Sequence, residues 1–179
     1  MTLSTTAKIA GVTLLIYIAA GMSGMAAAGN PGAVALLAVV QSFCALLLGV
    51  TFYVITRDED PNLALIAFAC RLIEAAPGHG EIYFAVGSAI FCWLLLRGRI
   101  IPVALAWLGL IASVGLVMLL SVQIAGFLGG PRNWASPLTW AAWLPMLVFE
   151  LALAAWLITK GVATPASFVT AAPAKHSAL

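Results

Sequence analysis

The sequence predicts an all-α fold: a polytopic membrane helix bundle with six transmembrane helices and both termini in the cytoplasm. Of its 179 residues, 64% are apolar and 8% are charged, whereas a soluble globular domain carries about a quarter charged residues. Apolar runs long enough to cross about 30 Å of hydrocarbon recur from end to end. We expect these runs to be helices, because lipid offers no partner for a free backbone N–H or C=O group.

Six spans form a single transmembrane domain over residues 1–162. They are expected at residues 9–28, 33–56, 62–76, 82–96, 101–128 and 137–159. The third and fourth are short, about 22 Å at 1.5 Å per residue, so we expect them to extend into their connection or to lie in thinned bilayer. Residues 163–179 are rich in Ala, Thr, Ser and Pro and are expected to form a disordered cytoplasmic tail.

The connections between the spans contain turn and capping residues. Residues 30–32, Asn-Pro-Gly, are typical of a turn between the first two spans. Asp60 is a good N-cap for the third span, with Pro61 at its first helical position. Gly98 and Pro102 indicate the turn before the fifth span.

Lysine and arginine are unevenly distributed between the two sides of the membrane. With the N-terminus inside, the outer side receives Arg132 alone. The cytoplasmic side receives Lys8, Arg57, Arg97, Arg99, Lys160 and Lys175. This bias predicts that both termini are cytoplasmic. An alternative is that Lys8, the apolar run after it and the small residues at 25–29 form a secretory signal peptide, whose cleavage would leave five spans.

Three ionisable residues, Arg71, Glu74 and Glu150, lie in the middle of predicted spans. A charge there costs at least a few kcal/mol unless it is compensated, so it indicates a polar network. Arg71 and Glu74 are three residues apart and share a helix face. Arg71 and Glu150 each lie about 15 Å from the cytoplasmic surface at 1.5 Å per residue. An Arg71–Glu150 ion pair is therefore geometrically available.

One arginine facing two carboxyl groups leaves one carboxyl without a cation, which makes this cluster the candidate site for a ligand or a proton. Gln41 and Gln123 are further polar residues within spans that could line the same cavity, and Pro145 could kink the last helix nearby. Two alternatives are that the charges only fix the register of the helices, or that they form a partner interface.

His79 and Glu81, in the outer connection after the third span, are secondary candidates, because histidine beside an acid can act as a base or a metal ligand. A glycine turn with Glu81 at a helix N-terminus is the simpler interpretation. His176 falls on the other side of the membrane, so no multi-histidine metal or haem site is expected. No nucleophile motif or phosphate loop is present either, and we expect no cofactor. The three cysteines, Cys44, Cys70 and Cys92, lie within apolar stretches, and we interpret them as small buried hydrophobic residues.

Small residues recur at four-residue spacing, which is typical of helix packing seams in lipid. The pairs are Ala20 with Gly24, Gly109 with Ser113, and Gly126 with Gly130. The expected partners are the lipid bilayer and, where a seam faces outward, another membrane protein or a second copy of the chain. The net charge of +2 is too small to indicate a nucleic-acid partner.

Several motifs between residues 60 and 162 resemble a family of small bacterial integral membrane proteins, domain-of-unknown-function family 4386. They are Cys-Arg-Leu-Ile-Glu-Ala at 70–75, Gly-Arg-Ile-Ile-Pro at 98–102, Ala-Leu-Ala-Trp-Leu-Gly-Leu at 104–110, Pro145, and Phe-Glu-Leu-Ala-Leu-Ala-Ala-Trp-Leu-Ile-Thr-Lys-Gly at 149–161. The resemblance implies six helices, an inner-membrane location and no established activity. It also implies that Arg71, Glu74 and Glu150 occupy the family's recurring polar positions. The connection at 29–32 is shorter than the family leads us to expect.

Together these observations predict a non-enzymatic integral membrane protein that binds or moves a small or lipidic ligand at its buried Arg/Glu cluster. The alternative is an accessory or regulatory subunit of a larger membrane assembly. An embedded enzyme is less favoured, because no complete catalytic constellation can be drawn. A water-accessible path to Glu74 or Glu150 would distinguish a transporter from an accessory subunit.

Overall fold

Six α-helices and their connections make up the described part of the chain. The computed structural model describes residues 2–76, 80–128, 134 and 136–163, and contains no β-strand within them. The helices are α1 Leu3–Ala26, α2 Pro31–Thr56, α3 Pro61–Glu74, α4 Gly80–Arg97, α5 Val103–Ile124 and α6 Pro137–Thr159. The all-helical prediction is therefore confirmed. The predicted tail lies outside the described residues, apart from its first residue.

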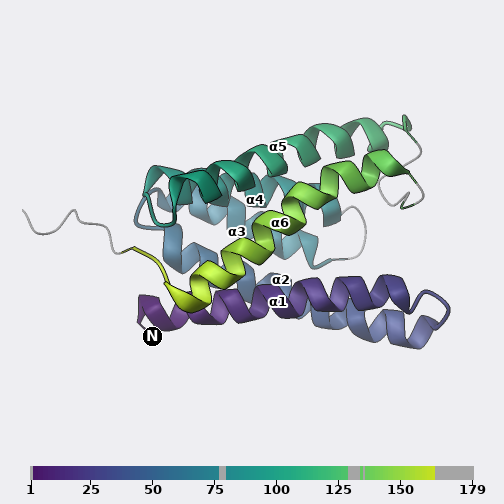
Figure 1. The fold of residues 1–179 in the computed structure, drawn as a ribbon, viewed down its shortest axis with the longest axis horizontal. Helices are drawn as coiled ribbons and strands as arrows, with labels where there is room; N and C mark the ends of the chain where they lie inside the picture. Colours follow the sequence, from purple (N-terminus) through teal and green to yellow (C-terminus); the bar gives the residue numbers. More distant parts are fainter. Residues whose placement is uncertain (1, 77–79, 129–133, 135, 164–179) are drawn as a thin grey trace, which may run out of the picture.

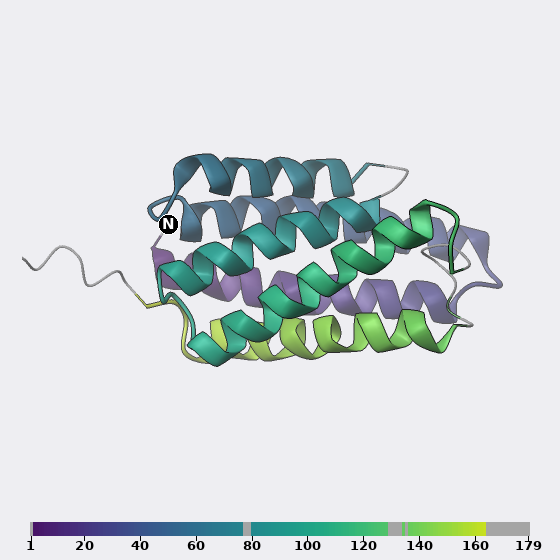
Figure 2. The ribbon, with the colours of Figure 1, turned by 90° about the horizontal axis from the view of Figure 1, so that it is seen from above.

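The helices form a closed ring. Each packs against its neighbours in the sequence, and α6 returns to pack against α1 (Figures 1 and 2). α6 crosses the bundle obliquely, lying beside α5 where it begins and beside α1 where it ends (Figure 1). α1 begins and α6 ends at the same end of the bundle. The centre of the ring is filled by apolar side chains from several helices, including Leu48, Phe91, Leu116 and Leu153.

The outer surface of the bundle is also apolar. Phe43 and Met118 each leave 68% of their surface exposed, and many other large apolar side chains point outward. Soluble proteins rarely expose apolar patches larger than a few hundred Å², so this surface is suited to lipid. Five of the helices are long and apolar enough to cross a membrane. The chain is thus a multi-pass membrane protein.

α3 departs from the six-span prediction. It has 14 residues, about 21 Å at 1.5 Å per residue, and does not cross 30 Å of hydrocarbon by itself. Its charged residues near the C-terminal end also lower its hydropathy. α3 therefore begins at one end of the bundle, where Asp60 accepts hydrogen bonds from the backbone N–H groups of Asn62 and Leu63, and ends inside it. The predicted N-cap is confirmed, whereas the predicted extension beyond residue 76 is not seen in the described residues.

α1 is an integral part of the core. Ala7 and Ala10 are fully buried, and Gly11 lies so close to α6 that an added Cβ would be 2.7 Å from Ile158 and 2.9 Å from the backbone oxygen of Ala154. Loss of α1 would open the ring and expose this face of α6. α1 thus closes the ring of six helices.

The predicted packing seams differ in whether another helix of the chain packs against them. Gly109 and Ser113 on α5 are buried against α4 and α6: a Cβ at Gly109 would overlap the ring of Phe149 and lie 2.7 Å from the Sγ atom of Cys92. Gly24 has no heavy atom near the position of its missing Cβ. The Gly109–Ser113 seam therefore joins helices of the same chain. Gly126, with φ of +91°, forms the turn after α5.

We predict that Gly109→Ala destabilises the protein by about 1–3 kcal/mol, because the new methyl group overpacks a filled contact between α5, α4 and α6. The measurement is the midpoint of thermal unfolding in detergent. Gly115→Ala is the matched control, since Gly115 lies on the same helix with no heavy atom near its missing Cβ. Equal midpoints for the two variants would contradict the packing of α5 described above.

Candidate functional site

The centre of the site is an ion pair on the last turn of α3. Arg71 Nη1 donates to Glu74 Oε2 at 2.8 Å, and the two side chains are only 4% and 6% exposed. The spacing of three residues brings both side chains to one face of the helix. Arg71 is also well placed as a cation at a helix C-terminus. The Ser42 hydroxyl of α2 donates to the backbone oxygen of Ala75 at 3.1 Å, which satisfies one carbonyl at this internal helix end.

Two further hydrogen bonds tie this pair to neighbouring helices. The Tyr17 hydroxyl of α1 donates to Glu74 Oε1 at 2.7 Å, and Arg71 Nη2 donates to Ser88 Oγ of α4 at 3.0 Å. The guanidinium carbon of Arg71 also lies 4.8 Å from the centre of the Phe84 ring, which is a favourable cation–π distance. The ion pair is thus held by α1, α3 and α4 together.

Glu150 lies on α6 across the bundle from Arg71. It is 7% exposed, and its carboxylate makes no hydrogen bond or ion pair with any residue that the structure describes. The sequence made a direct Arg71–Glu150 ion pair possible, because both residues lie at the same depth, but the structure does not contain this pair. Arg71 pairs with Glu74 instead, because that partner is on the same helix face and needs no reach across the core.

Arg71 and Glu150 nevertheless line the same cavity. Its volume is about 20 Å³, and Ser88 is the other polar residue in its wall. The rest of the wall is apolar and comes from α1, α2, α4 and α6; it includes Leu14, Phe52 and Cys92. Arg71 Nε is buried and has no hydrogen-bond partner in the described structure. A cavity of this size holds about one water molecule.

A column of aromatic rings extends from the cluster. Tyr17 and Phe84 are stacked with centroids 6.3 Å apart, and Phe84 stacks on Trp143 at 5.7 Å. Trp134 then contacts both Trp143 and Trp140. These rings continue the packed core from the cluster to the beginning of α6. Any opening of the cluster toward that end would have to separate them.

The other predicted site residues lie elsewhere. Gln41 is beside Gly21, between α1 and α2, and Gln123 Nε2 donates to Thr139 Oγ1 at 3.3 Å between α5 and α6. Neither lines the Arg71 cavity. Glu81 is in the first turn of α4, which agrees with the simpler interpretation of that segment. His79 lies outside the described residues.

Sequence reasoning missed Tyr17 and Ser88. Comparing depths along the helices would have identified both residues. Tyr17 and Glu74 each lie about 20 Å along helices that begin at the same end of the bundle. Ser88 lies about 14 Å from the end of α4, which is close to the depth of Arg71. Within the described residues, no three His, Cys, Asp or Glu side chains converge in a way that could hold a metal ion. Cys44, Cys70 and Cys92 are free and buried.

We predict that Tyr17→Phe lowers the free energy of unfolding by about 1–2 kcal/mol, because it removes a hydrogen bond to a buried carboxylate while keeping the ring. Tyr53→Phe is the control: its ring packs against Phe68 at 6.0 Å and its hydroxyl bonds no described residue. Unfolding midpoints in detergent measure the difference. If both variants behave like the parent protein, the Tyr17–Glu74 bond does not contribute to stability.

Comparison with known protein families matches the second half of the chain. Residues 77–161 match the model of a family described as Domain of unknown function (DUF4386). No curated protein and no solved structure matches the chain. The matched segment contains α4, α5 and α6 with Glu150, while Arg71 and Glu74 precede it, so the role that the resemblance implies for those two residues stays a prediction. Over residues 77–161 the chain therefore matches domain-of-unknown-function family 4386, the family that the sequence resemblance predicted.

Proposed function

We propose that this chain is a non-enzymatic inner-membrane protein that binds or moves a small ligand at the cluster of Arg71, Glu74 and Glu150. One observation carries the proposal: Glu150 and Arg71 line the same cavity, and neither the Glu150 carboxylate nor Arg71 Nε has a hydrogen-bond partner among the described residues. Buried polar groups in native proteins are nearly always hydrogen-bonded. An incomplete network around a water-sized space is therefore typical of a site that something else completes.

The cost of the unpaired groups supports a role beyond packing. Leaving one member of a buried charge network uncompensated destabilises a protein by several kcal/mol. The Arg71–Glu74 pair, with Tyr17 and Ser88, already fixes α3 against α1 and α4. Glu150 takes part in none of these bonds, which supports a role for it beyond fixing the helix register.

The size of the cavity favours a small ligand over a lipidic one. Pockets for organic molecules usually measure about 300–1,000 Å³, whereas this cavity measures about 20 Å³. A lipid chain would fit only if the helices around the site separated. The proposal therefore keeps the small ligand and leaves out the lipidic ligand that the sequence also allowed.

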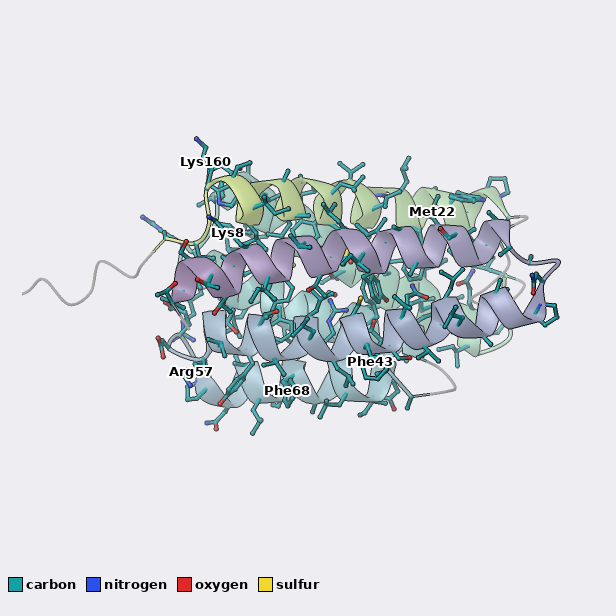
Figure 3. All side chains as sticks on the ribbon, turned by 90° about the horizontal axis from the view of Figure 1, so that it is seen from below. Lys8, Met22, Phe43, Arg57, Phe68 and Lys160 are labelled. Atoms are coloured by element: carbon teal, nitrogen blue, oxygen red, sulfur yellow. The ribbon has the colours of Figure 1, made fainter. Side chains whose placement is uncertain are left out.

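Cytoplasmic termini are part of the proposal. Lys8, Arg57 and Lys160 lie at the same end of the bundle as the beginning of α1 (Figure 3). Arg97 belongs to this end as well, because its Nη1 atom is 3.9 Å from Asp60 Oδ2. An excess of Lys and Arg at one end is typical of the cytoplasmic side.

An accessory subunit is the second candidate, supported by the outward face of α5. Gly115 has open space at its missing Cβ, and it lies between Ile111 and Met118, which are 65% and 68% exposed. Close helix approach at a glycine is a common way to bind a partner in lipid. Native mass spectrometry of the gently purified protein distinguishes the candidates: stoichiometric foreign subunits favour this one.

The proposed function predicts that the cavity opens to water. Cys92 lines the cavity and is a natural reporter once Cys44 and Cys70 are replaced by alanine. We expect a small, membrane-impermeant thiosulfonate to modify Cys92 in sealed membrane vesicles, from at least one side, when the helices around the site separate, because the reagent is larger than the closed cavity of about 20 Å³. The extent of modification is measured by mass spectrometry of the intact protein.

Gln123→Cys in a background without the native cysteines is the control for that experiment. Gln123 is 2% exposed, like Cys92, but lies outside the cavity. Faster modification of Cys92 than of the control cysteine supports an accessible site. Equal and negligible modification of both from either side would show a sealed cluster and contradict the proposed function.

A further inference from the structure

The charges of the cluster do not balance among its own members. Arg71 is the one cation facing the cavity, and its charge is matched by Glu74 at 2.8 Å. Arginine does not deprotonate in proteins, so an ionised Glu150 would add one uncompensated negative charge. The other titratable groups around it are Tyr17 of α1, which donates to Glu74, and the thiol of Cys92 of α4. Neither supplies a positive charge, and the walls from α2 and α6 are otherwise apolar.

The donor set of the cavity excludes most ligands that could supply that charge. A hard metal cation takes six or more oxygen ligands, whereas the side-chain oxygens in this wall belong only to Ser88 and Glu150. An organic cation does not fit in about 20 Å³. A proton needs a single carboxylate oxygen and no added volume.

The remaining volume suits one water molecule. A water requires about 10–15 Å³ and two to four polar partners. Arg71 Nε–H is an unused donor, and the Glu150 carboxyl supplies acceptors. Ser88 Oγ accepts from Arg71 Nη2 and keeps its own hydrogen to donate. Arg71, Ser88 and Glu150 all line the cavity and thus offer three polar partners to a water molecule.

We infer that this cavity is a proton-binding site, in which Glu150 takes the proton and one water molecule joins it to Arg71 Nε. The inference rests on the proposed function and names its ligand. Binding converts the Glu150 carboxylate to the neutral acid. A hydrated proton gives up its proton to the bridging water, and that water breaks one of its own O–H bonds as the new O–H bond forms at Glu150; no electron moves. Glu74 is not the acceptor, because its two carboxylate oxygens already accept hydrogen bonds from Tyr17 and Arg71. The cluster as a whole then holds one proton and no net charge.

Infrared spectroscopy of the full chain in lipid vesicles tests the inference. In neutral buffer we expect a carboxylic-acid C=O band that shifts on exchange into deuterium oxide. Glu150→Gln should abolish it. Glu74→Gln should also weaken it strongly, because the freed Arg71 would pair with Glu150 and remove the need for a proton. Asp58→Asn is the control, since this exposed carboxylate pairs only loosely with Arg57 at 3.8 Å and its loss should leave the band unchanged.

Three results decide the inference. A band that survives in Glu150→Gln, or no band in the parent protein, overturns it. A band that Glu74→Gln leaves intact overturns the inference that the proton on Glu150 depends on the pairing of Arg71 with Glu74. If Glu150→Gln does not fold, Glu150→Asp replaces it, because an aspartic acid at this position should move the band in frequency while an unrelated band would not move.

The same measurements separate this inference from the proposed function. If the thiosulfonate modifies Cys92 but no infrared band depends on Glu150, the site is accessible to water as proposed, and the inference that Glu150 binds a proton is wrong. If the carboxylic-acid band depends on Glu150 but Cys92 is not modified, only the proposal of an accessible site is contradicted. Glu150 then holds its proton in a cluster that is closed to water.

Discussion

The Arg71 guanidinium is the group on which the arrangement of the helices depends. Inside a bilayer no water is available to solvate it, so its charge must be matched by the protein. It meets Glu74 on its own helix, Ser88 on α4 and the Phe84 ring, and Glu74 in turn holds Tyr17 of α1. These contacts orient three helices around one point. Arg71 also lines the cavity that Glu150 lines.

The shortness of α3 follows from this role. A helix that ends inside the bundle leaves free carbonyl groups, which lipid cannot satisfy. Here the Ser42 hydroxyl bonds the backbone oxygen of Ala75, and Arg71 places a positive charge at the negative end of the helix. Glu74 at the same end opposes the helix dipole and is stable there only because Arg71 and Tyr17 both bond it. The internal helix end and the ion pair therefore depend on each other.

The helices could be predicted from the sequence, but only part of the site could. Apolar runs and local signals such as Asp60 and Pro61 determine where helices begin and end, and these act over a few residues. The choice of Glu74 rather than Glu150 as the partner of Arg71 depends on how each helix is rotated, which hydropathy does not contain. Gln41 and Gln123 illustrate the same limit: both are polar residues within spans, but they face the α1–α2 and α5–α6 contacts instead of the cavity.

The two parts of the cluster come from different parts of the chain. The segment that matches the family model supplies Glu150 and Ser88, whereas α1 and α3, which precede it, supply Tyr17, Arg71 and Glu74. The matched segment alone would hold a buried carboxyl with no cation near it. Arg71 comes near this segment only because α3 packs against α4, and Tyr17 only because α6 packs against α1. The site therefore exists only in the closed ring, and any motion that parts α6 from α1 alters the environment of Glu150.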